Sequence, residues 1–210
     1  MESISDFIAR YTSGAGAAGA GTAGESEGPG VEPDTGRPVE VDMTPFQFRL
    51  RDELDGMDQS AFQSSVAGRL ERTRKWSAEI DAAEKEFKLP QYSLLSVIAA
   101  ESGGDPTAGS NKGALGLGQF LEATGREEGL RITNAVDERL DPLKSIRAAA
   151  SRLQKDLKRA DGDIDGALIN YNWGQGNYRK WEKDVRARLP LETRNHILRH
   201  RMLMQAARGS

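Results

Sequence analysis

Residues 92–104 of this 210-residue chain read Tyr-Ser-Leu-Leu-Ser-Val-Ile-Ala-Ala-Glu-Ser-Gly-Gly. A helix built from this stretch carries apolar side chains on nearly every face, which is typical of a helix buried at the centre of a domain. Gly103 and Gly104 predict its C-terminal end, and Asp105-Pro106 prevents its continuation. Glu101 is therefore expected near the end of a buried helix.

The segments on either side of this helix also predict helices. Residues 60–87 repeat apolar side chains every three or four positions, which predicts one long helix that ends before Pro90. Further helices are expected at about residues 119–128, 142–160, 164–172, 177–188 and 191–207. No alternating β pattern of any length is present, so the expected fold is mainly α, with at most a short irregular β-hairpin in 103–118 or 130–137.

The N-terminal part of the chain has a different composition. Residues 13–31 are rich in Gly and Ala and cannot form a packed core, which predicts a flexible arm over residues 1–43. Within this arm a short amphipathic segment, either a docking peptide or a frayed terminus, is formed by Ile4, Phe7, Ile8 and Tyr11. We expect residues 44–87 to form a helical collar that packs on a domain at residues 88–210.

Composition excludes several classes of function. The chain has no Cys, which excludes disulfides and thiolate metal sites. It has only two His, so a Ser-His-Asp triad is not expected. No sequence pattern indicates a cofactor. No apolar run reaches the roughly 18 residues of a membrane span, and the first residues do not resemble a secretory signal peptide. Residues 144–210 carry 15 Lys and Arg against 7 Asp and Glu, which fits either a surface that binds a polyanion or a solvated helix face. No nucleic-acid motif is present in the sequence.

The chemistry is expected at Glu101. Apolar neighbours and the negative end of a helix dipole both disfavour a charged carboxylate, and both therefore raise its pKa. A carboxyl group with a pKa near neutrality is suited to general acid catalysis. The alternative is a Glu that reaches solvent where its helix ends.

His196 and His200 are spaced by one helical turn, which could mark a metal pair. No third ligand is evident from the sequence, so surface or packing histidines are the favoured interpretation and no metal site is predicted. Trp173 and Trp181 are expected in the core rather than as platforms for a sugar.

Four motifs follow one another from Glu101 onward. They are Glu101-Ser-Gly-Gly-Asp-Pro106 with Ser110, Gly113-Ala-Leu-Gly-Leu-Gly-Gln119, Ala167-Leu-Ile-Asn-Tyr-Asn-Trp-Gly-Gln-Gly176 and Pro190-Leu-Glu-Thr-Arg194. In this order and spacing the series resembles the soluble lytic transglycosylase family, over about residues 88–200. The resemblance implies a lysozyme-like helical domain that cleaves peptidoglycan.

The resemblance also implies a role for each matching residue. Glu101 would be the catalytic acid/base, Ser110 would hydrogen-bond the N-acetyl or lactyl group, and Gln119 would hydrogen-bond the sugar beside the scissile bond. Tyr171 would line the cleft near Glu101, and Asn172 would support that corner. The family has Met, Asn, Ala and Tyr where this chain has Gly118, Ser145, Asn170 and His196.

The number of carboxylates bears on the mechanism. A usual glycosidase needs a second carboxylate, and Asp105 and Glu122 are candidates only by their proximity in sequence. The resemblance favours one carboxylate: Glu101 protonates the bond between N-acetylmuramic acid and N-acetylglucosamine, and the muramoyl 6-hydroxyl then closes a 1,6-anhydro ring. Attack by water would make a muramidase, and a glycan-binding or structural module with little or no catalysis is a further alternative.

A wall-degrading chain without a signal peptide is expected to be a component of a phage particle that acts on the host cell wall during genome ejection. Its N-terminal arm would then contact other virion proteins. A specialised secretion machine, or lysis from within through holin pores, are the alternatives.

Overall fold

The computed structural model of the protein describes residues 44–58, 60–184 and 186–209, so the predicted arm at 1–43 lies outside the described residues. The chain divides into two compact units, residues 1–56 and 57–210, and the predicted collar is shared between them. In the first unit the structure describes α2 (Pro45–Leu54). This helix begins with a capping box, in which Thr44 and Gln47 each accept the other's backbone N–H.

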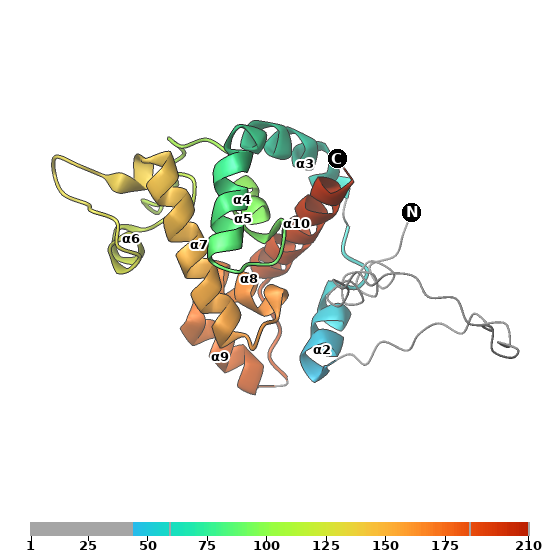
Figure 1. Cartoon of the computed structure of the whole chain (residues 1–210). Coiled ribbons are helices and arrows are strands. Elements are labelled where there is room, and N and C mark those ends of the chain that lie inside the picture. Colours follow the sequence, from blue (N-terminus) through green and yellow to red (C-terminus); the bar gives the residue numbers. More distant parts are fainter. Residues whose placement is uncertain (1–43, 59, 185, 210) are drawn as a thin grey trace, which may run out of the picture. The chain divides into compact units, whose positions relative to one another are not determined.

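The second unit is built from helices (Figure 1). In chain order these are α3 (Ser60–Thr73), the 3₁₀ helix η1 (Arg74–Trp76), α4 (Ser77–Glu86), α5 (Ser93–Ser102), α6 (Glu122–Glu127), the 3₁₀ helix η2 (Glu138–Leu140), α7 (Pro142–Arg159), α8 (Ile164–Trp173), α9 (Gln175–Lys183) and α10 (Leu191–Arg208). In the described ranges, β pairing consists of isolated bridges at Gly109–Leu115, Leu115–Phe120 and Ile132–Asp137. The mainly α prediction is confirmed. None of the described helices is both long and apolar enough to cross a membrane.

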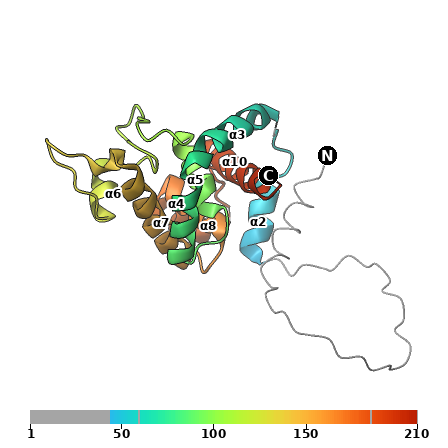
Figure 2. The same ribbon diagram turned by 45° about the horizontal axis from the view of Figure 1, so that its top comes forward.

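Helix α5 lies at the centre of the second unit. Every residue from Ser93 to Ala100 is buried, and the helix packs on α3, α4, α7 and α10 (Figures 1 and 2). A helix with apolar side chains on all its faces requires such an enclosure to remove them from water. The buried helix predicted from residues 92–104 is therefore confirmed.

The single helix predicted over residues 60–87 is wrong, because η1 separates α3 from α4. Trp76 leaves the helical conformation with φ −107° and ψ 9°. Its indole Nε1–H donates to the carbonyl oxygen of Gly104 at 3.0 Å. The interruption lets α3 pack on α5 and α10 while α4 packs on α5 and α7.

Two other helices have boundaries that differ from those predicted. Helix α6 begins at Glu122 rather than near residue 119, because Gln119 has a φ of +48° and Phe120 pairs with Leu115. Helix α9 ends at Lys183 rather than near residue 188, because Asp184 is extended and its carboxylate accepts the backbone N–H of Arg186.

The N-terminal end of α5 is capped by a side chain from α4. The buried carboxylate of Glu84 accepts the backbone N–H groups of Tyr92, Leu94 and Leu95 at 3.0, 2.9 and 3.2 Å. The first N–H groups of a helix have no partner within the helix, so an outside acceptor is needed wherever they are buried. Glu84 supplies it and fixes the position at which α5 begins.

The C-terminal end of α5 is capped by side chains from α3. Arg69 Nη1 donates to the carbonyl oxygens of Ala99 and Ala100 at 3.0 and 2.9 Å. Gly104 follows with a φ of +79°, and a Cβ at this position would lie 2.7 Å from the carbonyl oxygen of Arg72. Only glycine therefore allows the chain after α5 to approach α3 so closely.

Replacing Glu84 with Ala is expected to lower the free energy of unfolding by about 2–3 kcal/mol, because three backbone N–H groups lose their acceptor. Glu84→Gln retains one acceptor oxygen and should lose less. The control is Glu86→Ala, which removes an exposed carboxylate paired with Arg147 and should cost less than about 1 kcal/mol. Urea unfolding followed by circular dichroism measures all three, and equal losses for the two Ala variants would contradict the capping role.

Candidate active site

A pocket of about 620 Å³ lies beside the C-terminal end of α5. Arg69 of α3, Glu101 of α5 and Asn172 of α8 contribute to its wall. Two of the predicted site residues, Glu101 and Asn172, are therefore brought together from positions 71 residues apart. The volume is within the range of sites that accept small ligands.

Helix α10 supplies the largest part of the wall. Glu192, Asn195, His196 and Arg199 all face the pocket, together with the exposed Leu191 at the start of the helix. Their spacing of three and four residues places them on one helix face. Sequence reasoning assigned no pocket role to these residues, although that spacing is a signal that could have grouped them.

The carboxyl group of Glu101 is largely withdrawn from water. Its side chain is 19% exposed, and burial raises its pKa to about 7, while the guanidinium groups of Arg199 and Arg69 act in the opposite direction. Near neutral pH, a group with this pKa is present in both its protonated and its ionised form. The prediction that apolar surroundings raise the pKa of Glu101 is confirmed.

The second predicted cause, the negative end of the helix dipole, is offset. The guanidinium group of Arg69 lies against the last carbonyl groups of α5, where the dipole would place negative charge. The same cation lowers the pKa of Glu101. Burial therefore accounts for the raised pKa.

The loop between α5 and α6 carries Ser110 and Gln119, which are not among the residues of this pocket. The exposed Ser110 hydroxyl accepts the backbone N–H of Ala114 at 3.0 Å. The side-chain nitrogen of Gln119 donates to the carbonyl oxygens of Ala108 and Gly116 at 2.9 and 3.0 Å. Both side chains thus shape the loop, and their role toward a sugar stays a prediction.

Gly118, where the family has Met, lies under an aromatic ring. A Cβ at this position would be 2.5 Å from the ring of Phe120, so a larger side chain requires the ring to move. The Gly118 N–H donates to the Ser145 hydroxyl, and its carbonyl oxygen accepts the Tyr171 hydroxyl, both at 3.1 Å. Burial raises the pKa of Tyr171, and the Glu101 carboxylate raises it further, which agrees with a position close to Glu101.

Arg139 also orders this loop, and no motif indicated it. The side chain is buried, and its Nη1 donates to the carbonyl oxygens of Gly113 and Phe120, each at 3.1 Å. The carboxylate of Asp137 accepts from the same guanidinium group at 2.6 Å. Only its distant partners reveal this role, because a lone Arg between two loops has no distinctive sequence pattern.

The two carboxylates considered as partners of Glu101 have other contacts. Asp105 accepts hydrogen bonds from the backbone N–H and the hydroxyl of Thr107, and Glu122 accepts from Arg126. Neither residue lines the pocket. Glu192, which was not considered, is the carboxylate that shares the pocket wall with Glu101.

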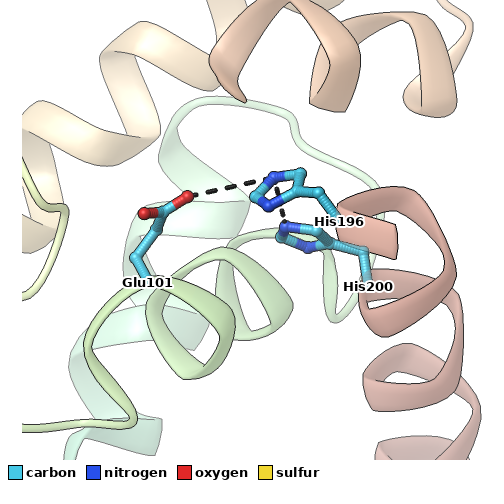
Figure 3. A group of neighbouring side chains, drawn as sticks. All are labelled: Glu101, His196 and His200. Carbon is cyan, nitrogen blue, oxygen red and sulfur yellow. Dashed lines mark hydrogen bonds and ion pairs between the residues drawn. The ribbon is translucent and has the colours of Figure 1, made fainter. Parts of the chain in front are cut away.

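His196 and His200 are both buried, which agrees with packing rather than surface histidines. Their Nε2 atoms are 2.9 Å apart, and Nε2 of His196 is 3.9 Å from Oε1 of Glu101 (Figure 3). Burial lowers the pKa of His196 to about 3 and also lowers the pKa of His200, so both rings are neutral. Of the two predicted core tryptophans, Trp181 is fully buried and Trp173 is half-buried.

A large part of the chain matches a known protein family. The family model described as Transglycosylase SLT domain matches residues 78–192, more than half of the chain. The chain belongs to this family. The matched segment includes Glu101 and Asn172, whereas Arg69 and the α10 residues from Thr193 onward lie outside it.

Several curated proteins are similar to this SLT chain over part of their length. The peptidoglycan transglycosylase gp16 of Escherichia phage T7 is 44% identical over 87 residues, 40% of this chain and 7% of that protein. The transglycosylase of Enterobacteria phage PRD1 is 35% identical over 51% of this chain and 37% of its own. The membrane-bound lytic murein transglycosylase D of Escherichia coli K12 is 30% identical over 73% of this chain and 35% of its own. The chain thus spans little more than a third of these relatives at most.

The fold of the SLT chain is also found in a solved structure. An inactive mutant of the lytic transglycosylase Slt from Pseudomonas aeruginosa superposes with a TM-score of 0.53 at 22% identity. The match covers 63% of this chain and 24% of the other. At this identity the likeness supports the shared lysozyme-like fold.

Removing the charge of Arg199 is expected to raise the pKa of Glu101 above about 7, because this guanidinium favours the ionised carboxylate. In Arg199→Gln the titration of Glu101 should move to higher pH. Carbon-13 NMR of labelled glutamate carboxyl groups follows this titration, with a chelator present to remove trace metal ions. The control is Arg126→Gln on α6, which lies outside the pocket. A downward shift in Arg199→Gln, or equal shifts in both variants, would contradict this assignment.

Proposed function

We propose that the chain is a peptidoglycan lytic transglycosylase that cleaves the β-1,4 bond between N-acetylmuramic acid and N-acetylglucosamine. The observation that carries this proposal is the position of Glu101, a nearly buried carboxyl group at the end of the central helix and on the wall of a pocket. The chain's membership of the SLT family supports the same conclusion, as does its partial similarity to proteins named as transglycosylases.

In the proposed reaction Glu101 acts first as an acid and then as a base. The protonated carboxyl donates its proton to the glycosidic oxygen, and the bond from C1 to this oxygen breaks. The N-acetyl oxygen of the substrate stabilises the oxocarbenium-like state. The carboxylate then takes the proton of the muramoyl 6-hydroxyl, whose oxygen attacks C1 and forms the 1,6-anhydro end. No water is consumed, and a pKa of about 7 suits both proton transfers.

The surroundings of Glu101 agree with its alternation between two charge states. Arg199 and Arg69 favour the ionised carboxylate that forms after the first proton transfer. Burial favours the protonated form that starts the reaction. Tyr171, Gln119, Ser110 and Asn172 are proposed to orient the glycan beside this group.

A hydrolytic reaction is the second candidate, because Glu192 shares the pocket with Glu101. A second carboxylate at a distance that leaves room for water is the arrangement of inverting glycosidases. Glu192 is exposed, and the charges that act on Glu101 come from Arg199 and Arg69. We therefore favour the single-carboxylate reaction.

We also propose that the protein belongs to a phage particle and acts on the host cell wall during genome ejection. Two of the similar proteins are phage transglycosylases, which supports this role. The predicted arm at residues 1–43 would contact other virion proteins.

Glu101→Gln is expected to lower the rate of lysis of purified sacculi by about 10²–10⁴, because the amide cannot donate a proton, while the fold is retained. Glu192→Gln should lose less than about tenfold, since it takes no part in proton transfer in this mechanism. Asp105→Asn, outside the pocket, is the control. Turbidity of sacculi gives the rate, and thermal unfolding verifies the fold. Wild-type lysis by Glu101→Gln would end the assignment, and equal losses in the two Gln variants would favour hydrolysis.

Mass spectrometry of purified particles tests the virion role. The particle proteins are expected to include peptides from this chain in amounts comparable with those of structural proteins. Its presence in infected cells but not in purified particles would contradict the virion role and would favour lysis from within.

A further inference from the structure

Glu101 of α5 and His196 and His200 of α10 turn their polar atoms toward one another (Figure 3). Each residue offers one ligand atom, and the three atoms lie within 4.8 Å of one another. The closest pairs are the two Nε2 atoms at 2.9 Å and the Glu101 Oε1–His196 Nε2 pair at 3.9 Å. The third ligand that the sequence lacked is thus supplied by a helix about a hundred residues earlier in the chain.

These distances are close to those of a tetrahedral metal site. Zinc binds imidazole nitrogen and carboxylate oxygen at roughly 2.0–2.2 Å, which places neighbouring ligand atoms about 3.3 Å apart. The two shorter separations lie on either side of this value and the third is at most 4.8 Å, so changes of about 1.5 Å or less in these separations would complete the site. Two His and one Glu leave one coordination position for water, as in known zinc sites with this ligand set.

The hydrogen bonds of His200 determine which of its ring nitrogens can bind a metal ion. The Ser96 hydroxyl donates its single proton to the carbonyl oxygen of Ser93 at 2.7 Å, so it can only accept from Nδ1 of His200 at 2.9 Å. His200 therefore carries its proton on Nδ1 and turns an unprotonated Nε2 toward His196 and Glu101. A hydrogen bond from the other ring nitrogen is what usually orients a metal-binding histidine.

Charge and access set limits on the site. Glu101 and His196 both line the pocket, which gives an ion a path from solvent. Both histidines are neutral, as ligands must be, and His196 would have to move its proton from Nε2 to Nδ1. Arg199 and Arg69 face the same carboxylate and repel a cation, so the affinity depends on them.

We propose that Glu101, His196 and His200 bind one divalent ion of the zinc class, and that the bound ion prevents Glu101 from acting as an acid. The first part depends only on the three side chains. The second part rests on the proposed function, because a carboxylate that coordinates a metal cannot also protonate a glycosidic oxygen.

Titration of the full chain with Zn²⁺ against a chromophoric chelator tests the site directly. We expect one ion per chain in the wild type and affinity about 10–100-fold lower in Ser96→Ala, which removes the hydrogen bond behind His200 but no ligand. His200→Phe should abolish the binding. Arg199→Gln should bind more tightly, because a repelling charge is removed. The control Glu122→Gln should match the wild type, and circular dichroism verifies the fold of each variant.

Absence of saturable 1:1 binding, or wild-type affinity in Ser96→Ala and His200→Phe, would overturn the site. Replacing Zn²⁺ with Co²⁺ should give the intense visible absorption of a tetrahedral complex in the wild type but not in His200→Phe. Lysis of sacculi should stop at saturating Zn²⁺ and return with a chelator; undiminished lysis would overturn the inhibitory part alone. If the chain binds Zn²⁺ but has no lytic activity, the site stands and the proposed function fails.

Discussion

Two side chains from the segment before α5 determine where the Glu101 carboxyl group lies. Glu84 accepts the first N–H groups of α5, and Arg69 donates to its last carbonyl groups. Because α5 is buried on all sides, these polar groups would otherwise be without water, at a cost of about 1–3 kcal/mol each. The helix is thus held at both ends, and Glu101 cannot slide along its axis. The two helices that hold it, α3 and α4, form the part of the predicted collar that belongs to the same compact unit.

The same arrangement sets the electrostatics of the pocket. Arg69 serves both as the cap of α5 and as a cation near Glu101, while Arg199 approaches from α10. Burial nevertheless outweighs the two cations, and the pKa of Glu101 remains raised. The two histidines of α10 add no positive charge, because burial lowers their pKa values and keeps both rings neutral. Near neutral pH the Glu101 carboxyl group is therefore present in both its protonated and its ionised form.

Much of the central helix could be predicted from the sequence, because the relevant signals are local. Apolar residues on every face indicated burial, and Gly103 and Gly104 indicated the helix end. The break at Trp76 could not be predicted, since it depends on a hydrogen bond to Gly104, 28 residues away. Local pattern likewise placed His196 and His200 on one helix face but gave no sign that Glu101 would meet them. Arg69 and Arg139 were missed for the same reason: each acts through carbonyl groups that only the folded chain brings near.

The central claim is that one carboxyl group, held by a helix capped at both ends, transfers protons without a partner acid and without water as a reactant. Digestion of purified peptidoglycan in water labelled with oxygen-18, followed by mass spectrometry of the muropeptides, tests this claim most directly. The account predicts 1,6-anhydro-muramoyl ends that carry no label. Reducing ends that contain oxygen-18 would show that water attacks the sugar and would contradict it.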